Sequence, residues 1–163
     1  MSRETKPPQP FDAREIRLAR RGMKLVGPAH VWLYRASCGR IWGRFPSSKV
    51  PVLLLTTVGR RSGEPRTVPL IYLDDGDRLV IVASQGGLPT HPAWYHNLVA
   101  HPLVTVQTRR RSRELEARVV DDDERAELWP RLVERYADYD GYQARTDRQI
   151  PVVVLDPVLD RVR

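Results

Sequence analysis

Two apolar runs joined by a short basic turn, within residues 50–72 (VPVLLLTTVGRRSGEPRTVPLIY), constrain the fold of this chain more than any other segment. Their content of Val, Leu, Ile and Thr predicts strands at residues 51–57 and 66–73. Gly59 and Gly63 allow a sharp reversal between the strands, and we expect the turn to leave backbone N–H groups open to a ligand. The segment therefore predicts a β-hairpin that can hold a ligand against the end of a sheet.

The tip of this hairpin is strongly basic. Arg60 and Arg61 make a fork that matches carboxylate or phosphate oxygens, and Arg66 lies just beyond on the returning strand. A solvated tip that carries arginines for solubility is the alternative, and for this turn taken alone it is the better interpretation. The case for an anion site therefore depends on other parts of the chain.

Two further stretches have the character of a ligand cradle. One follows a predicted strand, and its glycines permit close approach of the backbone to a ligand. The other begins a predicted helix, where free N–H groups and the helix dipole favour an anion. These stretches are Ser84-Gln85-Gly86-Gly87 and Pro92-Ala93-Trp94-Tyr95.

The rest of the chain continues in mainly antiparallel strands. Acidic and glycine residues at 74–77 and the basic residues 109–111 are typical of hairpin turns. Pro69 within the second strand indicates an edge position or a bulge. Six strands with peripheral helices predict a mainly β, α+β fold built as a small barrel. The other strands are expected at residues 79–84, 103–109, 114–120 and 152–155, and helices at 92–100 and 121–136, the second containing Pro130.

Residues 1–49 are predicted to form a basic N-terminal region, separate from a domain at residues 50–163. Asp12 and Glu15 make a capping box for a helix over residues 12–26, and Pro28 is expected to begin a second helix. The first helix is amphipathic, which allows it either to cover the barrel or to lie on an anionic membrane surface. One arc of it carries Arg14, Arg17, Arg20, Arg21 and Lys24.

The charge of the chain is concentrated in this N-terminal region. Residues 1–49 contain 11 Lys and Arg against 3 Asp and Glu, whereas residues 50–163 contain 16 against 17. A nucleic-acid-binding domain usually carries its basic surface on the folded body, so the sequence argues against nucleic acid as a partner. The longest apolar run of the strand region, at residues 52–55, is too short to span a bilayer.

Motifs for common catalytic chemistries are missing from the sequence. It has no P-loop, no dinucleotide fingerprint and no zinc-protease motif, and Cys38 is its one cysteine. A lone cysteine fits a reducing cytoplasm. His91, His96 and His101 lie five residues apart, which spreads them around a helix, so we expect no metal site. If the protein is an enzyme, a cofactor must supply the reactive atoms.

In this order, these stretches resemble the deazaflavin-dependent nitroreductase and quinone reductase family of actinobacteria. The resemblance covers residues 50–157 and includes LLLTTVGRRSGEPRTVPLIY, VASQGG, HPAWYHNL and YADYDGYQARTDRQIPVVVLDP, with Trp129-Pro130 between the last two. It implies a split β-barrel of the flavin-reductase type and reduced coenzyme F420 as the cofactor.

The resemblance also implies which residues line the cofactor site. Basic groups of the family hold the phosphate and polyglutamate tail of the cofactor. Gln85 stands where relatives commonly have Lys, and Val68 where they often have Asn. Ile71 stands where the nitroimidazole-activating member has Tyr. The implied cofactor-binding residues are Thr57, Gly59, Arg60, Arg61, Arg66, Ser84, Gln85, Gly86, Gly87, Ala93 and Trp94.

Tyr136, Tyr139 and Tyr142 have the spacing of an aromatic face, which favours packing on the domain when periodicity alone is considered. Their match to substrate-side tyrosines of the family favours an aromatic wall over a flat acceptor instead. With Ser84, they are the candidates for hydrogen bonding to the acceptor. The expected reaction is hydride transfer from reduced F420 to a menaquinone-like quinone or a nitroaromatic compound.

Two other classes of protein share these features. A split barrel that uses FMN or haem would have the same architecture, and a non-catalytic protein could bind the deazaflavin without turning it over. We expect a cytoplasmic protein that contacts the inner face of the membrane through residues 12–26. The sequence leaves the oligomeric state undetermined.

Overall fold

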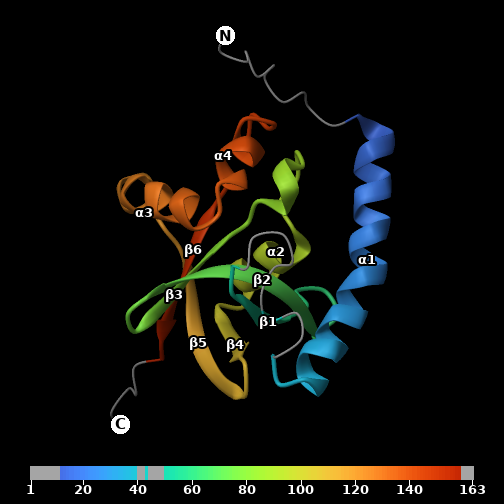
Figure 1. Cartoon of the computed structure of the whole chain (residues 1–163), viewed down its shortest axis with the longest axis vertical. Helices are drawn as coiled ribbons and strands as arrows, with labels where there is room; N and C mark the ends of the chain where they lie inside the picture. The colour runs from blue at the N-terminus through green and yellow to red at the C-terminus, as the bar shows by residue number, and fades with distance from the viewer. Residues whose placement is uncertain (1–11, 40–42, 44–49, 159–163) are drawn as a thin grey trace.

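The computed structural model describes residues 12–39, 43 and 50–158, and in them a closed antiparallel barrel carries its helices on the outside (Figure 1). The order of the strands around the barrel is β1-β2-β3-β6-β5-β4, and every neighbouring pair is antiparallel. The predicted barrel is therefore confirmed. The strands within the described residues are β1 (Val52–Val58), β2 (Pro65–Asp75), β3 (Arg78–Val82), β4 (Leu103–Thr108), β5 (Arg111–Val119) and β6 (Val152–Pro157).

Strands β1, β3 and β6 are buried on both faces, which explains why their sequences are nearly continuous apolar runs. In β1, Leu53 and Leu55 fill the barrel interior, whereas Val52 and Leu54 lie outside it against α1 (Ala13–Ala36). The outer face of β3 and β6 packs against Leu128 and other apolar residues of the last two helices. The core therefore has an interior layer and two outer layers.

The strand register places the connecting segments at two opposite ends of the barrel. Pairing of Val58 with Pro65 puts the turn at residues 59–64 at one end. Pairing of Val82 with Val152 puts the residues that follow β3 at this same end, which we call the arginine-turn end. The turns that join β2 to β3 and β4 to β5 lie at the opposite end, called the hairpin end. The predicted cradle stretches therefore gather at one end of the barrel.

Helix α1 is continuous across Pro28, so the prediction of two separate helices is wrong. The capping box at its start is confirmed, since Asp12 accepts from the Glu15 amide and Glu15 accepts from the Asp12 amide. Proline removes one helical hydrogen bond, but packing beyond it offsets this loss. The Tyr34 hydroxyl donates to the Val52 carbonyl at 3.1 Å and accepts from the Arg109 amide at 2.8 Å.

The other helices connect strands at the arginine-turn end of the barrel, and α3 packs on the outer face of β3 and β6. Helix α2 (Ala93–Ala100) and helix α3 (Asp122–Arg135) are close to their predicted bounds, and α3 continues through Pro130. Helix α4 (Asp138–Gln143) was not predicted, because it is one short turn with no side-chain cap and is held by burial of Tyr139. No helix in the described part of the chain is long and apolar enough to cross a bilayer.

Pro69 lies on a locally unpaired edge, as predicted. The ladder between β2 and β3 covers residues Tyr72 to Asp75, so the part of β2 around Pro69 has β1 as its ladder partner in the described structure. A residue without an N–H group costs no ladder bond there. The barrel is closed, but it is split along this stretch of β2.

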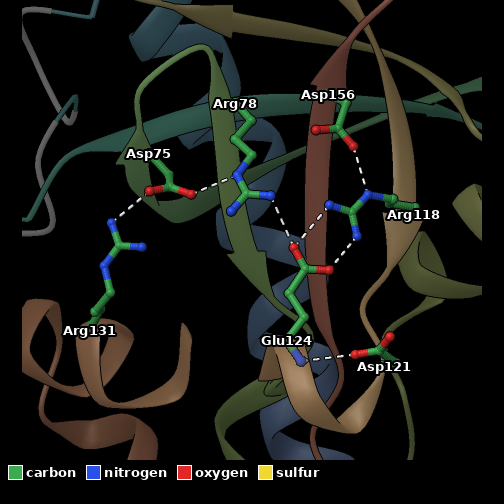
Figure 2. Close-up of polar contacts among 7 residues, drawn as sticks. All are labelled: Asp75, Arg78, Arg118, Asp121, Glu124, Arg131 and Asp156. Carbon is green, nitrogen blue, oxygen red and sulfur yellow. Dashed lines mark hydrogen bonds and ion pairs between the residues drawn. The ribbon is translucent and has the colours of Figure 1, made fainter. Parts of the chain in front are cut away.

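A network of ion pairs fastens α3 to the barrel (Figure 2). Glu124 of α3 bonds Arg78 of β3 at 3.0 Å and also bonds the guanidinium of Arg118 on β5. These cations hold the pKa of the Glu124 carboxyl below its usual range. The remaining pairs of the network are Asp75–Arg78, Asp75–Arg131 and Arg118–Asp156.

Replacing Glu124 by Gln should lower the free energy of unfolding by about 1 kcal/mol, because two part-exposed ion pairs lose their charge. A carboxyl with a lowered pKa stabilises the fold above its ordinary pKa, and that contribution is lost as the pH falls through the acid range. The wild type should therefore approach the variant in stability near pH 3 in urea denaturation. Glu127→Gln, at an exposed position of α3, is the control and should change stability little at any pH. A loss of the same size in both variants would contradict a role for the network.

Candidate active site

The turn at the arginine-turn end uses its own backbone groups, contrary to expectation. The Gly59 amide donates to the Glu64 carbonyl at 2.8 Å, and the Gly63 amide donates to the Gly59 carbonyl at 2.7 Å. The Glu64 amide donates to the Ser62 hydroxyl, and the Arg60 amide donates to a side chain of α2. The prediction that the turn leaves its N–H groups open to a ligand is therefore wrong for these four amides, which the turn itself and α2 already bond.

The arginine side chains of the turn remain available. Arg60, Arg61 and Arg66 are exposed, and no ion pair joins them to a carboxylate among the described residues. A guanidinium without an internal carboxylate partner can give its donors to an anion. Anion binding at this turn is therefore a property of side chains rather than of the backbone.

Asn97 of α2 holds this turn, and sequence reasoning missed it. Its Oδ1 accepts from the Arg60 amide at 3.1 Å, and its Nδ2 donates to the Thr57 hydroxyl at 3.2 Å. Asn97 and Thr57 are buried, as is Ser84, and all three buried polar residues found in the described structure lie at the arginine-turn end. The sequence feature that could have indicated this role is a polar residue within the largely apolar stretch HNLVA.

The β3–α2 loop (residues 83–92) has a backbone that only some residues adopt. Gln85, Gly86 and Gly87 have φ values of 49°, 66° and 82°. A Cβ atom on Gly87 would come within 2.7 Å of the Tyr142 carbonyl oxygen, so the loop packs tightly against α4. Glycine is required at position 87 both for this contact and for the positive φ.

Gln85 leaves a hydrogen-bond acceptor unused in this loop. Its side-chain oxygen Oε1 is buried and has no partner in the described structure. Buried polar atoms in folded proteins are nearly always bonded, so an unpaired one beside a ligand cradle favours a donor on the ligand. Gln85 therefore fits a role in binding.

The start of α2 exposes Ala93 but buries Trp94. The Trp94 side chain is 7% exposed and packs in the barrel interior, so its indole ring belongs to the core. The N-cap residue Pro92 provides no side-chain hydrogen bond. Backbone N–H groups of the first turn are therefore the part of this stretch that suits a ligand.

The three tyrosines form one cluster beside the β3–α2 loop. Their ring centroids lie 5.1 to 6.3 Å apart, and the hydroxyls of Tyr136 and Tyr142 are 3.1 Å apart. Tyr136 and Tyr139 are buried in the outer core, which agrees with the packing interpretation, whereas Tyr142 is half-buried. Burial raises the pKa of Tyr136 and of Tyr139, so both stay protonated at neutral pH. The cluster can present a neutral phenol as a donor.

The described site therefore combines exposed arginines, an unpaired acceptor and neutral hydroxyls at one end of a barrel. Residues 28–157 match the F420H(2)-dependent quinone reductase family. This chain belongs to that family. The family, the oxidoreductase class and coenzyme F420 as the cofactor were expected from the sequence, and the match confirms them.

Curated relatives and solved structures agree with this assignment. An F420H(2)-dependent quinone reductase of Mycobacterium tuberculosis is 45% identical over 129 residues, which cover 77% of this chain and 86% of the relative. A solved F420-H2 dependent reductase is 41% identical, with a TM-score of 0.61, over 65% of this chain and 94% of its own. The heme storage protein HutZ of Vibrio cholerae shares the fold, at 17% identity and a TM-score of 0.51, over 66% of this chain and 82% of its own.

Proposed function

We propose that this member of the family transfers a hydride from reduced F420 to a quinone at the arginine-turn end of the barrel. The main support is the register of the strands, which brings the arginine turn, the β3–α2 loop and the start of α2 together. These stretches lie far apart in the sequence, and ligands bind where such stretches converge. The predicted cofactor residues belong to all three of them.

The residues at this end fit the chemistry of the cofactor. An acidic tail suits the exposed guanidinium groups of Arg60, Arg61 and Arg66. The unpaired Oε1 of Gln85 suits an N–H or O–H donor of the ligand. Because Gln85 supplies no cation, the arginines of the turn are the proposed source of positive charge for the tail.

The reduced deazaflavin supplies the hydride, and the protein positions the acceptor and stabilises its charge. A quinone oxygen gains negative charge when the hydride arrives at the ring. The hydroxyl of Ser84 and that of Tyr142 are the proposed donors, because Ser84 begins the β3–α2 loop and Tyr142 packs beside it. Tyr136 orients Tyr142 through their hydroxyl contact, and Tyr139 packs both rings. Water provides the proton at neutral pH, where a phenol gives up its proton slowly.

The same arrangement would accept other electron-poor rings. A nitroaromatic compound offers a flat ring and oxygens that gain negative charge in the same way as those of a quinone. We propose it as an adventitious acceptor that uses the same donors. Steady-state competition between menadione and a nitroaromatic compound tests this, since a shared site requires competitive inhibition.

Replacing Arg60, Arg61 and Arg66 together by Ala should raise the Kd for F420 on the order of a hundredfold, since several charge-assisted contacts are lost. Fluorescence titration of the purified protein measures this change. The control replaces Arg110, Arg111 and Arg113 by Ala, which removes the same charge at the hairpin end. An equal rise of the Kd in both variants would mean that only the net charge of the protein matters, and would reject the proposed tail site.

Replacing Ser84 by Ala or Tyr142 by Phe should lower kcat with menadione roughly tenfold to a hundredfold, because a donor to the charged oxygen is lost. The Kd for F420 should change far less than in the arginine variant, because neither substitution removes a cation. Tyr72→Phe, at the hairpin end, is the control and should keep the wild-type kcat. If kcat is unchanged in both Ser84 and Tyr142 variants, the proposed donors are wrong.

We also propose that α1 brings the protein to an anionic membrane, where quinones reside. The C-terminal part of α1 covers the barrel through Val31 and Tyr34. The N-terminal part extends beyond the barrel, as Figure 1 shows. Leu18 in this part is 60% exposed, and Trp32, in the part that covers the barrel, is 69% exposed. They lie fourteen residues apart and so share one face of the helix. Arg14 and Arg17, which precede Leu18 on the helix, are exposed, as expected for a helix at a lipid surface. The other basic side chains of the predicted arc lie outside the described part.

Replacing Leu18 and Trp32 together by Glu should weaken binding to phosphatidylglycerol vesicles at least about tenfold, because two apolar side chains no longer insert. Co-sedimentation of the full chain measures this. The matched control is Val99→Glu with Val158→Glu, which adds the same charge at two other exposed apolar positions. Equal pelleting of wild type and both variants would exclude α1 as the membrane contact.

A further inference from the structure

Arg148 lies between α4 and β6, and its guanidinium spans the β3–α2 loop. Nε donates to the Leu88 carbonyl at 2.9 Å, and Nη2 donates to the carbonyls of Ser84 at 2.8 Å and Ala83 at 3.2 Å. Nη1 lies 3.0 Å from Nδ1 of His91. No ion pair joins Arg148 to a carboxylate among the described residues, so the loop itself balances this charge.

The loop needs this support because its own bonds are few. Within it, the Gly87 amide donates to the Ser84 carbonyl at 3.0 Å, and the Leu88 amide donates to the Gln85 carbonyl at 3.3 Å. Gln85 has a positive φ, which is unfavourable for a residue with a side chain. A cation that binds three carbonyls offsets this cost and fixes the direction of the chain.

Arg148 is itself held in place from α4. Its carbonyl accepts from Nε2 of Gln143 at 2.9 Å, and Oε1 of Gln143 accepts from the Ile150 amide at 2.9 Å. The same oxygen accepts from Nη2 of Arg125 at 3.1 Å. The segment that carries Arg148 is therefore tied to α3 and α4, and the loop is tied to this segment through the guanidinium.

The contact with His91 requires a neutral imidazole. An arginine can only donate, so Nδ1 of His91 must accept and its proton lies on Nε2. Burial, followed by the charges of Arg148 and His96, lowers the pKa of His91. The titratable groups that face this ring are Arg148 from the segment before β6, and Tyr95 and His96 from α2.

We propose that Arg148 is the positioning residue of the cofactor site. Its contacts order the β3–α2 loop, and the protonation state of His91 makes this ordering dependent on pH. The guanidinium connects the glycine-containing part of the loop with the residue that directly precedes Pro92 and α2. It therefore fixes two of the three cradle stretches relative to each other. Protonation of His91 places a hydrogen on Nδ1 opposite the guanidinium, which breaks the contact and loosens the loop.

The direction of the pH effect follows from the lowered pKa. The unfolded or loosened state binds a proton more readily than the ordered state, so the contact stabilises the loop above the ordinary histidine pKa of about 6.5. This stabilisation is lost as the pH falls below that value. Cofactor affinity should fall over the same range, since an ordered loop is required for binding; this second step rests on the proposed function.

The test compares pH 7.5 with pH 5.5 in wild type, Arg148→Lys, His91→Gln and the control His101→Gln, at an exposed position after α2. Hydrogen exchange of the β3–α2 loop, corrected for intrinsic rates, is measured without cofactor, and the Kd for F420 is measured by fluorescence. Titration of the cofactor itself is common to all variants and cancels between them. Thermal unfolding of each variant confirms that it is folded.

Wild type and His101→Gln should show faster loop exchange and a Kd roughly tenfold higher at pH 5.5, the effect of losing one charge-assisted bond. His91→Gln, whose amide oxygen accepts without titrating, should remove most of this dependence. Arg148→Lys should exchange rapidly at both pH values, because an ammonium cannot span the same acceptors.

Unchanged loop exchange in a folded Arg148→Lys protein would overturn the positioning role. If His91→Gln keeps the pH dependence of loop exchange seen in the wild type, the role of His91 is overturned. Loop exchange that responds as expected while the Kd does not would overturn the link to the cofactor site. Failure of the wild type to bind F420 at either pH would instead reject the proposed function, and loop exchange alone would then decide whether Arg148 holds the loop.

Discussion

Hydrogen bonding of β1 to both of its neighbours is the constraint on which the site depends. The β1–β2 register places the arginine turn beyond Val58, and the β1–β4 register places the start of β4, and α2 before it, at the same end. Because side chains alternate along a strand, a slip of one residue would move Leu53 and Leu55 out of the barrel. The burial of these leucines therefore also fixes the position of the turn.

Arginine has three distinct uses in this structure. Arg78 and Arg118 neutralise carboxylates and fasten α3, which carries the chain to the tyrosine cluster. Arg148 binds backbone carbonyls and shapes a loop. Arg60 and Arg61 have no carboxylate partner in the described structure and so suit an external anion. The planar guanidinium serves each use because it offers several donors in fixed directions.

The order of the site depends on a few buried polar contacts between elements distant in sequence. Asn97 joins α2 to the arginine turn, and Arg148 joins the segment before β6 to the β3–α2 loop. Both act on backbone groups, so they control the path of the chain rather than the chemistry. Gln85 differs from both, since its buried side-chain oxygen has no partner in the described structure.

Local patterns were sufficient for much of the fold and for part of the site. The apolar runs of β1, β3 and β6 and the capping box of Asp12 and Glu15 act through neighbouring residues, and their structures agree with prediction. Family resemblance correctly indicated the cofactor. The roles of individual site residues stay predictions.

The features that were not predicted correctly share a physical cause. The continuity of α1 through Pro28 depends on packing of Tyr34 against the barrel, and α4 depends on burial of Tyr139. The amides of Gly59 and Gly63 are bonded by carbonyls of the turn, and that of Arg60 is bonded by Asn97, 37 residues away in the sequence. No local pattern carries such information.

The sequence by itself determined the strands, the basic turn and the family, because these follow from residue types at short spacing. The tertiary structure alone decided which backbone groups remain open, which side chains hold the loops, and where the three cradle stretches meet. These depend on strand register and on contacts between distant residues, which arise when the barrel closes.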